Sequence, residues 1–585
     1  MTCPDFVPSH LRKYVVDQSY EQYTPIDQAV WRYIMRQLRQ FLATHAHPCY
    51  LEGLVKTGTT IDTIPHIDAM SAALEKFGWR AVPVSGFLPP AAFMELQAQG
   101  ILPIGAAIRS LDHLLYTPAP DIVHEAAGHA PILIDPEFSD YLKKYAQVAN
   151  KSILNHEDMA LYEAIRVLSD LKEDPTAKPA AVAAAEHHLT DTVAALGAPS
   201  EGALVARMNW WTVEYGLIGS VDRPLIYGAG LLSSLGECRW CLESKVKKLP
   251  MSLACADFAY DITEPQPQLF VAPDFATLSR VIDEFANRMA FKRGGMYGLT
   301  QIRDAKTINT AELNSGVQIS GVLEEFLSAD DRPMYLRFAG PSQLSYRDAE
   351  LPGHDIARHA HGFGTPVGRL QGATKCLSQY TLGDLKKIGA VIGQSLTLHF
   401  DSGVTVSGVL KNMVQRDGKN LIFTFTDCRV THGERVLFDP AWGEFDMVIG
   451  EAVTSCFGGA ADRNAYGETQ DFVVQHVPTR TFTKKESALM QLYTQIRELR
   501  ERPQTPTDQA EALCLVLDVL GRDHPDDWLL RVEILELSHQ LPTLPAWQAA
   551  LVRSLQHFAD EHPQWAGCIH DGIALAQQTI TSAAA

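Results

Sequence analysis

The sequence predicts a multidomain protein with a mainly α-helical first part, a β-rich domain after it, and an α-helical C-terminal region. Three observations support this order. The chain has 585 residues, more than one ordinary hydrophobic core accommodates. Apolar residues recur at helical spacing up to about residue 310, and again from about residue 484. Between these parts they alternate with polar residues. We therefore expect four segments: 1–70, 71–315, 316–480 and 481–585.

Helical spacing is clear at both ends of the first part. In 1–70, an N-terminal helical segment, the recurring residues are Trp31, Ile34, Leu38 and Phe41. A Pro- and Gly-rich stretch from Pro83 to Pro90 interrupts the pattern. Further along, the recurring residues are Leu278, Ile282 and Phe285. These spacings predict helices packed by one apolar face.

The alternating segment predicts paired β-strands. Leu396, Leu398 and Phe400 alternate with polar residues, and the pattern resumes beyond a turn at 401–403. Residues 420–431 repeat the alternation after the turn-forming pair Asp417-Gly418. In the C-terminal region the helical period returns at Leu489, Leu492, Tyr493, Ile496 and Leu499. The roles of the β-rich and C-terminal segments cannot be assigned from their residues.

Charge and composition exclude some classes of partner. The formal net charge is -19 and the sequence pI is about 5.5, so nucleic acid and anionic membranes are poor partners. No apolar run approaches the roughly 20 residues of a membrane helix, and the first thirty residues lack a secretory signal. We expect a cytoplasmic protein with free cysteines. Cys238 and Cys241 form one CxxC pair without a partner set, which indicates packing residues rather than a zinc site.

Segment 116–129 contains candidate metal ligands. His124, Glu125 and His129 lie close together, but the two histidines are five residues apart. On an ideal α-helix that spacing directs two side chains about 140° apart. Gly128 offers a solution, because it can end or distort the helix just before His129. The i,i+4 spacing of the zinc-protease motif HExxH is not matched.

Glu214 is the candidate third ligand, since it lies in an apolar, aromatic stretch where a lone carboxylate needs a partner. Two imidazoles and one carboxylate form the facial triad of non-haem iron oxygenases. Asp121 could orient the His124 ring through its second nitrogen. From spacing alone, a chance pair of histidines and a salt-bridged Glu214 remain the more common arrangement. A zinc hydrolase with Glu125 as base and a catalytically inactive binding protein are the alternatives from other classes.

A second group of histidines lies in a Gly-rich stretch of the β-rich segment. His354, His359 and His361 could form another metal site. We interpret the stretch instead as a solvated loop, the more common setting for such residues.

Several motifs resemble one known family. The segments RSLDHLLYTPAPDIVHEAAGHAP, WWTVEYGL and YGAGLLSSLGE, with VPVSGFLPPAAF before them and YDITEPQPQLFVA after them, are similar to the catalytic domain of the aromatic amino acid hydroxylases. They occur in the family's order over about residues 75–295. The resemblance implies a mainly α catalytic domain at 71–315 that uses Fe(II), O2 and a tetrahydropterin co-substrate to hydroxylate a free aromatic amino acid.

The resemblance also implies residue roles. The metal ligands would be His124, His129 and Glu214. Arg109 and Thr117 would contact the substrate carboxylate, and the rest of the substrate site would comprise Tyr116, Pro120, Trp210, Gly230, Ser233 and Ser234. The pterin would contact Leu88, Phe93 and Glu125. Asp121 and Ser233 would support the ligands, with Ser233 bonded to a ligand histidine.

Two positions favour L-Phe as substrate and L-Tyr as product. Family members that act on Phe or Tyr have a tryptophan at the position of Trp210, as this chain does. At the position of Ile262, tyrosine hydroxylases have an acidic residue, whereas the isoleucine here gives an apolar wall. Tryptophan and tyrosine hydroxylases of the same family are the alternatives. Pro90 departs from the family, since many members have a pterin-facing serine there. A homo-oligomer is a further possible assembly.

Overall fold

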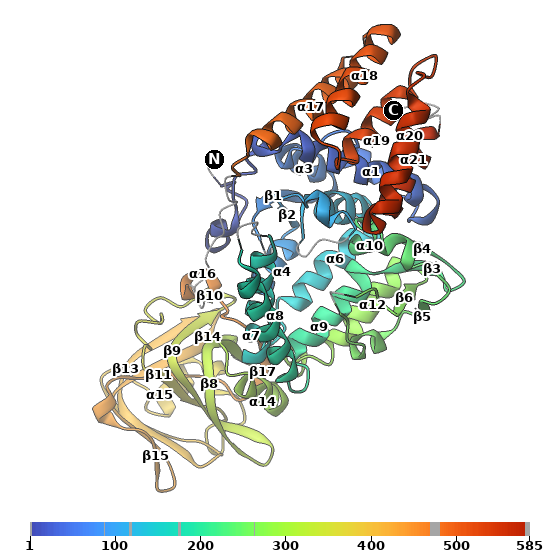
Figure 1. Ribbon diagram of the computed structural model, residues 1–585. Coiled ribbons are helices and arrows are strands. Elements are labelled where there is room, and N and C mark those ends of the chain that lie inside the picture. Colours follow the sequence, from blue (N-terminus) through green and yellow to red (C-terminus); the bar gives the residue numbers. More distant parts are fainter. Residues whose placement is uncertain are drawn as a thin grey trace.

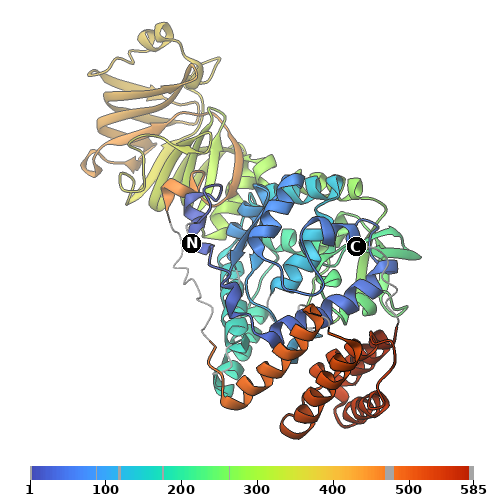
Figure 2. The ribbon, with the colours of Figure 1, turned by 90° about the horizontal axis from the view of Figure 1, so that it is seen from above.

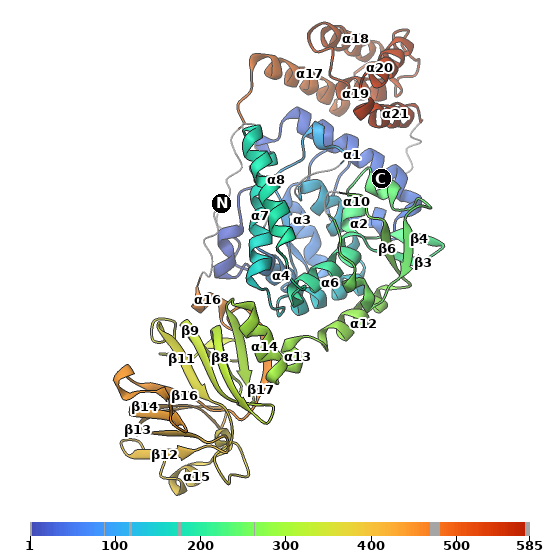
Figure 3. The same ribbon diagram turned by 60° about the horizontal axis from the view of Figure 1, so that its bottom comes forward.

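The computed structural model describes residues 3–86, 88–115, 120–173, 177–261, 264–467, 480–502 and 504–578. We call helices α1–α14 with their associated strands the helical part, strands β7–β17 the β part, and helices α17–α21 the tail. The tail lies at one end of the elongated molecule and the β part at the other, with the helical part between them (Figures 1 and 3). The division of the chain at 70, 315 and 480 stays a prediction.

Helix α1 (Pro25–His45) lies on the side of the helical part that faces the tail (Figure 3). Its start is fixed by Thr24, which forms a reciprocal capping box with Asp27, and by Pro25 at the first helical position. The apolar face predicted from the sequence is buried, and Trp31 and Ile34 are inaccessible to solvent. The other helices of seven or more residues in this part are α2 (Tyr50–Lys56), α3 (Ile67–Leu74), α4 (Pro90–Ala98), α6 (Pro136–Ala149), α7 (His156–Glu173), α8 (Pro179–Ala194), α9 (Glu201–Asn209), α12 (Phe275–Ala286) and α14 (Gly295–Ala305).

Two small sheets lie against these helices. Strands β1 (Arg80–Val84) and β2 (Ile101–Gly105) form a parallel pair connected through α4. The second sheet has the order β4-β3-β6-β5. Its strands are β3 (Leu217–Ser220), β4 (Arg223–Ile226), β5 (Lys247–Pro250) and β6 (Gln268–Ala272). The mainly helical class predicted for this part therefore includes short strands that the helical pattern did not indicate.

The β part consists of two sheets. One has the order β10-β9-β8-β7-β17 with β11 paired to β9, and the other has the order β12-β13-β14-β15 with β16 paired to β14. The first contains β7 (Asn309–Leu313), β8 (Val317–Ala329), β9 (Arg332–Tyr346), β10 (Ala349–Glu350), β11 (Gly362–Pro366) and β17 (Val453–Gly458). The second contains β12 (Ser395–His399), β13 (Val404–Arg416), β14 (Lys419–His432), β15 (Arg435–Phe438) and β16 (Phe445–Val448).

The alternation in the sequence matches the strands of the second sheet. Leu396 and Leu398 of β12 face the core, while the residues between them are exposed. The turn predicted at Asp417-Gly418 joins β13 to β14, and both residues have positive φ (49° and 72°). This conformation matches the strand twist of a two-residue hairpin.

The tail packs on α1. Its helices are α17 (Lys484–Glu501), α18 (Pro506–Asp523), α19 (Leu529–Ser538), α20 (Gln548–Glu561) and α21 (Pro563–Gln577), and they gather on one side of the helical part (Figure 2). The buried guanidinium of Arg32 on α1 makes two hydrogen bonds to Glu533 on α19, at 2.5 and 2.9 Å. Apolar residues of α1 and the tail belong to one hydrophobic core. The tail is therefore anchored by both charge pairing and apolar packing.

Among the described residues, no helix is long and apolar enough to cross a membrane. Cys238 and Cys241 are both buried, and burial raises the pKa of the Cys238 thiol to about 12. A protonated, buried thiol agrees with the packing role expected for this pair.

Candidate metal centre

The two predicted histidine ligands lie on one π-helical segment, η5 (His124–His129). In a π-helix the backbone hydrogen bond joins residues i and i+5, so side chains five positions apart lie on the same face. This winding removes the spacing problem of an ordinary α-helix. Of the two effects expected of Gly128, an end to the helix or a distortion of it, the first does not occur, because η5 continues directly into α5 (Ala130–Ile132). The π-helical winding itself is a distortion of the ordinary helix.

Gly128 instead allows a close approach of two backbone segments. A Cβ atom at this position would lie only 2.5 Å from the carbonyl oxygen of Ala229, the first residue of α10 (Ala229–Leu232). Such a contact is far inside van der Waals distance, so only glycine allows η5 and α10 to pack this closely. Since α10 leads directly into Ser233, this packing brings the serine beside His124.

Glu214 meets both histidines from a second π-helical segment, η6 (Trp210–Glu214). Nε2 of His124 and Nε2 of His129 each lie 3.3 Å from one oxygen of the Glu214 carboxylate. The two nitrogens are 3.1 Å apart. Neighbouring ligand atoms that bind one ion at about 2.1 Å are separated by roughly 3 Å. The three side chains are therefore spaced to bind a single metal ion.

The charge of the site also suits a metal cation. Burial alone would raise the pKa of Glu214, but the imidazoles of His129 and His124 lower it far below its usual value. The carboxylate is therefore ionised at neutral pH. Two imidazoles and one carboxylate on one side of an ion leave coordination positions open, which is the donor set of non-haem Fe(II) oxygenases. The residues present fit a ferrous ion.

Ser233, rather than Asp121, contacts the second ring nitrogen of His124. Its Oγ lies 3.1 Å from Nδ1 of His124, the contact expected of this serine. Asp121 accepts a hydrogen bond from the backbone N–H of His124 at 3.0 Å, so the ring contact expected of Asp121 is not made. The reason is that both oxygens of Asp121 are bonded to Arg109, at 2.7 and 2.9 Å. Asp121 therefore fixes the start of η5 and not the imidazole.

Arg109 is buried beside the metal ligands and held in one orientation. Besides its two bonds to Asp121, its Nη1 donates to the carbonyl oxygen of Ser233 at 3.2 Å. These contacts use three of the five N–H donors of a guanidinium, which leaves two for a ligand. An arginine fixed by a carboxylate in this way can bind a second carboxylate without losing further side-chain freedom.

Glu125 lies in the interior next to His129, with Oε2 of Glu125 at 4.0 Å from Nε2 of His129. Burial raises the pKa of Glu125 to about 8, although the His129 side chain opposes this shift. The carboxyl group is therefore mainly protonated at neutral pH. Within the described structure, its buried Oε2 has no hydrogen-bond partner. A protonated carboxyl group can donate a hydrogen bond to a ligand.

Trp210, the first residue of η6, is part of an aromatic stack. The Trp210 ring lies between Tyr215, at 4.5 Å, and Tyr260, at 4.4 Å, with nearly parallel planes. These contacts fix the indole plane about one helical turn before Glu214. Tyr260 was not among the predicted site residues, although it begins one of the motifs that carried the family resemblance.

The structure brings some of the other predicted residues to the same region. Gly230 lies against Glu214 and Tyr215, since an added Cβ would be 3.1 Å from the Glu214 carbonyl oxygen and 3.0 Å from the Tyr215 ring. Ser234 is buried and its Oγ donates to the carbonyl oxygen of Leu115 at 3.2 Å. Leu88, just before α4, and Phe93, on α4, are both half-buried. Pro120 is exposed. Tyr116, Thr117 and Ile262 lie outside the described residues.

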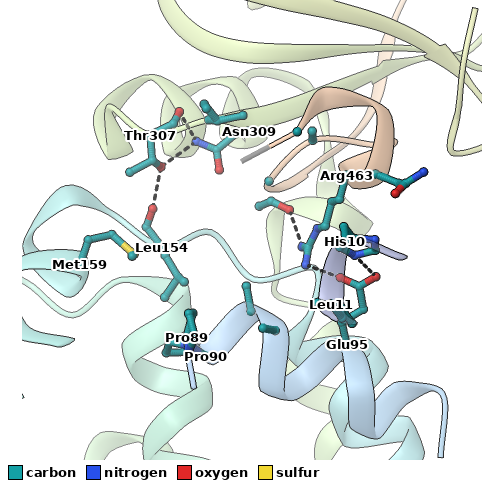
Figure 4. Close-up of a pocket in the computed structure, with 18 of the residues that line it drawn as sticks. His10, Leu11, Pro89, Pro90, Glu95, Leu154, Met159, Thr307, Asn309 and Arg463 are labelled. Carbon is teal, nitrogen blue, oxygen red and sulfur yellow. Dashed lines mark hydrogen bonds and ion pairs between the residues drawn. The ribbon is translucent and has the colours of Figure 1, made fainter. Parts of the chain in front are cut away.

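A separate cavity of about 650 Å³ lies where the helical part meets the β part (Figure 4). Pro89 and Glu95 line it from one side, and Asn309 and Arg463 from the other. Glu95 accepts hydrogen bonds from His10 at 2.8 Å and from Arg463 at 3.3 Å. The metal ligands are not among its lining residues, so this cavity is distinct from the metal centre.

The interpretation of the second histidine group as a solvated loop is wrong for two of its three members. His354 and His359 are 5% and 7% exposed, whereas His361 is exposed. Strand β16, which lies far along the chain, supplies Asp446 next to the two rings. No local pattern in the sequence indicated this contact.

The part of the chain that contains this centre is similar to known proteins. Residues 13–153 and 182–306 match the profile of a family described as biopterin-dependent aromatic amino acid hydroxylases. This part of the chain is similar to that family. The hydroxylase match begins well before residue 75, the start of the motifs that resemble the family, and it includes α1.

Individual relatives cover the same part. The phenylalanine-4-hydroxylase of Mesorhizobium japonicum is 29% identical over 269 residues, which are 45% of this chain and 81% of that protein. The rat enzyme of the same name is 30% identical over 276 residues, again 45% of this chain but only 50% of that protein. The chain thus spans about half the length of the mammalian relatives it matches. A crystal structure of Chromobacterium violaceum phenylalanine hydroxylase with Fe(III) is 26% identical, with a TM-score of 0.37, over 47% of this chain and 84% of that one.

Proposed function

We propose that this chain is a monooxygenase that hydroxylates the ring of a free aromatic amino acid, converting L-Phe to L-Tyr. It would use O2, Fe(II) and a tetrahydropterin co-substrate. The observation that carries the proposal is the convergence of His124, His129 and Glu214, whose ligand atoms lie 3.1–3.3 Å apart. This convergence occurs in the part of the chain that matches the hydroxylase family.

His124, His129 and Glu214 would hold the ferrous ion. Bound there, Fe(II) would provide the place where O2 reacts and the tetrahydropterin would supply the two electrons that do not come from the substrate, so that one oxygen atom enters the ring and the other goes to the pterin. The protein contributes position rather than bond-making. Ser233 and the close packing of η5 on α10 fix the His124 ring, and burial of His129 limits water at the ion.

Arg109 would bind the substrate carboxylate with the two N–H groups left free by Asp121 and Ser233. The Trp210 stack would supply one apolar wall for the substrate ring, together with Gly230 and Ser234. Because Gly230 has no side chain, the Tyr215 ring and the Glu214 carbonyl oxygen can pack closely against it. Pro120, Tyr116 and Thr117 remain predicted members of this site.

The pterin would be held by Leu88 and Phe93 near the start of α4 and by Glu125. The raised pKa of Glu125, about 8, gives the pterin a hydrogen-bond donor instead of a negative charge at neutral pH. An apolar residue at 262 favours L-Phe over L-Tyr, because a buried substrate hydroxyl would find no acceptor there. The cytoplasmic location and the homo-oligomer stay predictions.

The deciding experiment is product analysis. The iron-loaded full chain is incubated with a tetrahydropterin, O2 and an equimolar mixture of Phe, Tyr and Trp, and the products are separated. We expect Tyr from Phe as the main product. Hydroxytryptophan as the main product would assign the other specificity, and a pterin-independent enzyme with bound zinc would overturn the proposal.

A matched pair of variants tests the metal ligands. Glu214→Gln keeps the size of the side chain but removes its charge, so we expect loss of bound iron and of activity. Asp222→Asn makes the same change in an exposed turn between β3 and β4 and should retain both. Retention of stoichiometric iron by Glu214→Gln would contradict the ligand assignment.

A further inference from the structure

The β part contains a second group of metal-binding side chains. His354 and His359 lie in the segment between β10 and β11 in the first sheet, and Asp446 lies on β16 in the second sheet. All three are buried, with exposed fractions of 5%, 7% and 5%. One ligand atom from each lies within 4.8 Å of the others.

The spacing of these atoms resembles that of the first centre. Nδ1 of His354 lies 3.4 Å from Nε2 of His359, compared with 3.1 Å between the nitrogens of His124 and His129. Nδ1 of His354 lies 3.9 Å from Oδ2 of Asp446. Two ligand atoms bound to one ion at 2.0–2.2 Å can be separated by about 3 to 4 Å, depending on the angle at the metal. The third pair, His359 and Asp446, lies within 4.8 Å, so the side chains would close in by up to about 1 Å for one ion to contact all three.

The backbone holds both histidines in place. The carbonyl oxygens of His354 and His359 accept hydrogen bonds from Leu344 and Ser342 of β9, at 3.0 and 3.2 Å. The His359 ring also makes an edge contact with Phe363 of β11, with centroids 5.1 Å apart. The two imidazoles are stacked at an angle of 13°, with their ring nitrogens facing each other. These residues are part of the sheet edge and do not form a mobile loop.

The carboxylate of Asp446 is oriented by two hydrogen-bond donors. Thr424 of β14 donates to Oδ1 of Asp446 at 2.6 Å, and Nε of Arg358 donates to Oδ2 at 2.7 Å. A carboxylate oxygen has two lone pairs, so Oδ2 can accept from Arg358 and still bind a cation. The Arg358 charge is shared with Glu444, whose oxygen lies 3.1 Å from Nη2. The arginine therefore acts as the partner that fixes a ligating carboxylate.

A neutral imidazole carries the lone pair that a metal needs. Nδ1 of His354 and Nε2 of His359 face each other at 3.4 Å, which allows one weak hydrogen bond between the two rings at most.

We propose that His354, His359 and Asp446 form a second metal site, which binds one divalent transition-metal ion, Zn(II) by preference. Two imidazoles and one carboxylate with a fourth position for water are a common tetrahedral set for this ion. The ion would join the two sheets of the β part where β11 and β16 meet. At this seam Thr365 of β11 already donates a hydrogen bond to the carbonyl oxygen of Val448 on β16, at 3.1 Å. The site would be independent of the iron centre.

Metal stoichiometry in five full-length proteins tests the proposal. The metal-free proteins are titrated with Co(II), whose visible absorption reports its coordination, and the bound metal is counted after gel filtration. We expect two ions per chain in the unaltered protein, one in Glu214→Gln, one in His359→Gln and none in the double variant. His361→Gln alters the exposed neighbour in the same segment and should keep both ions.

A second variant at the same site distinguishes loss of a metal ligand from misfolding of His359→Gln. Asp446→Asn keeps the shape of the side chain and its contact with Thr424, and it should lose the same ion and the same absorption band. In Glu214→Gln, where the first centre is lost, Zn(II) should displace this Co(II) band and raise the melting temperature, with no such rise once Asp446→Asn is added. The proposal is overturned if Glu214→Gln binds no ion, or if His359→Gln and Asp446→Asn both keep two ions per chain.

Discussion

Replacing Gly128 with alanine tests whether close packing of η5 on α10 shapes the metal centre. The new Cβ would lie 2.5 Å from the Ala229 carbonyl oxygen, and contacts below 3.0 Å are not tolerated. The two segments must therefore separate by about 0.5 Å or more, since both partners are backbone and cannot rotate away. Such overpacking typically costs about 1–3 kcal/mol of stability.

The separation would act on the iron ligand through Ser233. Its Oγ lies 3.1 Å from Nδ1 of His124, so an added 0.5 Å takes this contact beyond hydrogen-bond distance. Loss of a hydrogen bond that orients a ligating imidazole typically weakens metal binding by roughly 10–100-fold. We therefore expect Gly128→Ala to weaken Fe(II) binding by this factor and to lower the unfolding free energy.

Iron affinity is measured by competition with a calibrated chelator, and stability by urea denaturation of the metal-free protein. Gly521→Ala on α18 is the matched control, because nothing lies within 4 Å of an added Cβ there. It should leave iron affinity unchanged and stabilise the chain by up to about 1 kcal/mol. Ser233→Ala should reproduce the loss of affinity with less loss of stability. Unchanged iron affinity in Gly128→Ala would refute the reasoning.

Three further perturbations test other parts of the molecule. Arg109→Ala should raise KM for the amino acid by roughly tenfold to a hundredfold, since a charged hydrogen bond contributes about 1.5–3 kcal/mol; an unchanged KM in steady-state assays would remove Arg109 from the site. Glu533→Ala should destabilise the tail by about 3–5 kcal/mol, because it leaves the Arg32 charge buried without its partner; limited proteolysis that releases no tail faster than in the unaltered chain would contradict this. Burial raises the pKa of Glu237 from 4.5 to about 7, so its protonated form stabilises the fold below pH 4.5 and that contribution is lost as the pH rises through 7. Glu237→Gln should therefore be more stable than the unaltered chain above pH 7 and equal to it at pH 4, and denaturation midpoints with no pH-dependent difference would exclude this.

The sequence indicated the ligand residues but not the backbone that presents them. His124, His129 and Glu214 were predicted, and the structure brings all three within 3.3 Å of one another. Their π-helical winding was not predicted, because local propensity favours an α-helix over the same residues. The winding is compatible with the fold because α10 packs against Gly128, a contact with a segment a hundred residues away.

Strands and helices with a regular apolar period were easier to predict than loops. The alternation at Leu396 and Leu398 corresponds to β12, since one face of a strand packs on the core. The contact of His354 and His359 with Asp446 depends instead on β16, whose position follows from sheet pairing rather than from the residues around the histidines. Tyr260 was missed for the same reason, as its stacking on Trp210 is a contact between distant segments.

The two histidine pairs of this chain show why spacing alone does not assign a metal site. Both pairs are five residues apart, yet one is presented by a π-helix and the other by a segment bonded to a sheet edge. In each case the third candidate ligand comes from a distant element, Glu214 in one and Asp446 in the other. A carboxylate delivered to two adjacent imidazoles is the feature they share. This feature distinguishes both pairs from the many histidine pairs that lie exposed on a protein surface. Metal stoichiometry in the paired variants measures whether the feature is sufficient for metal binding.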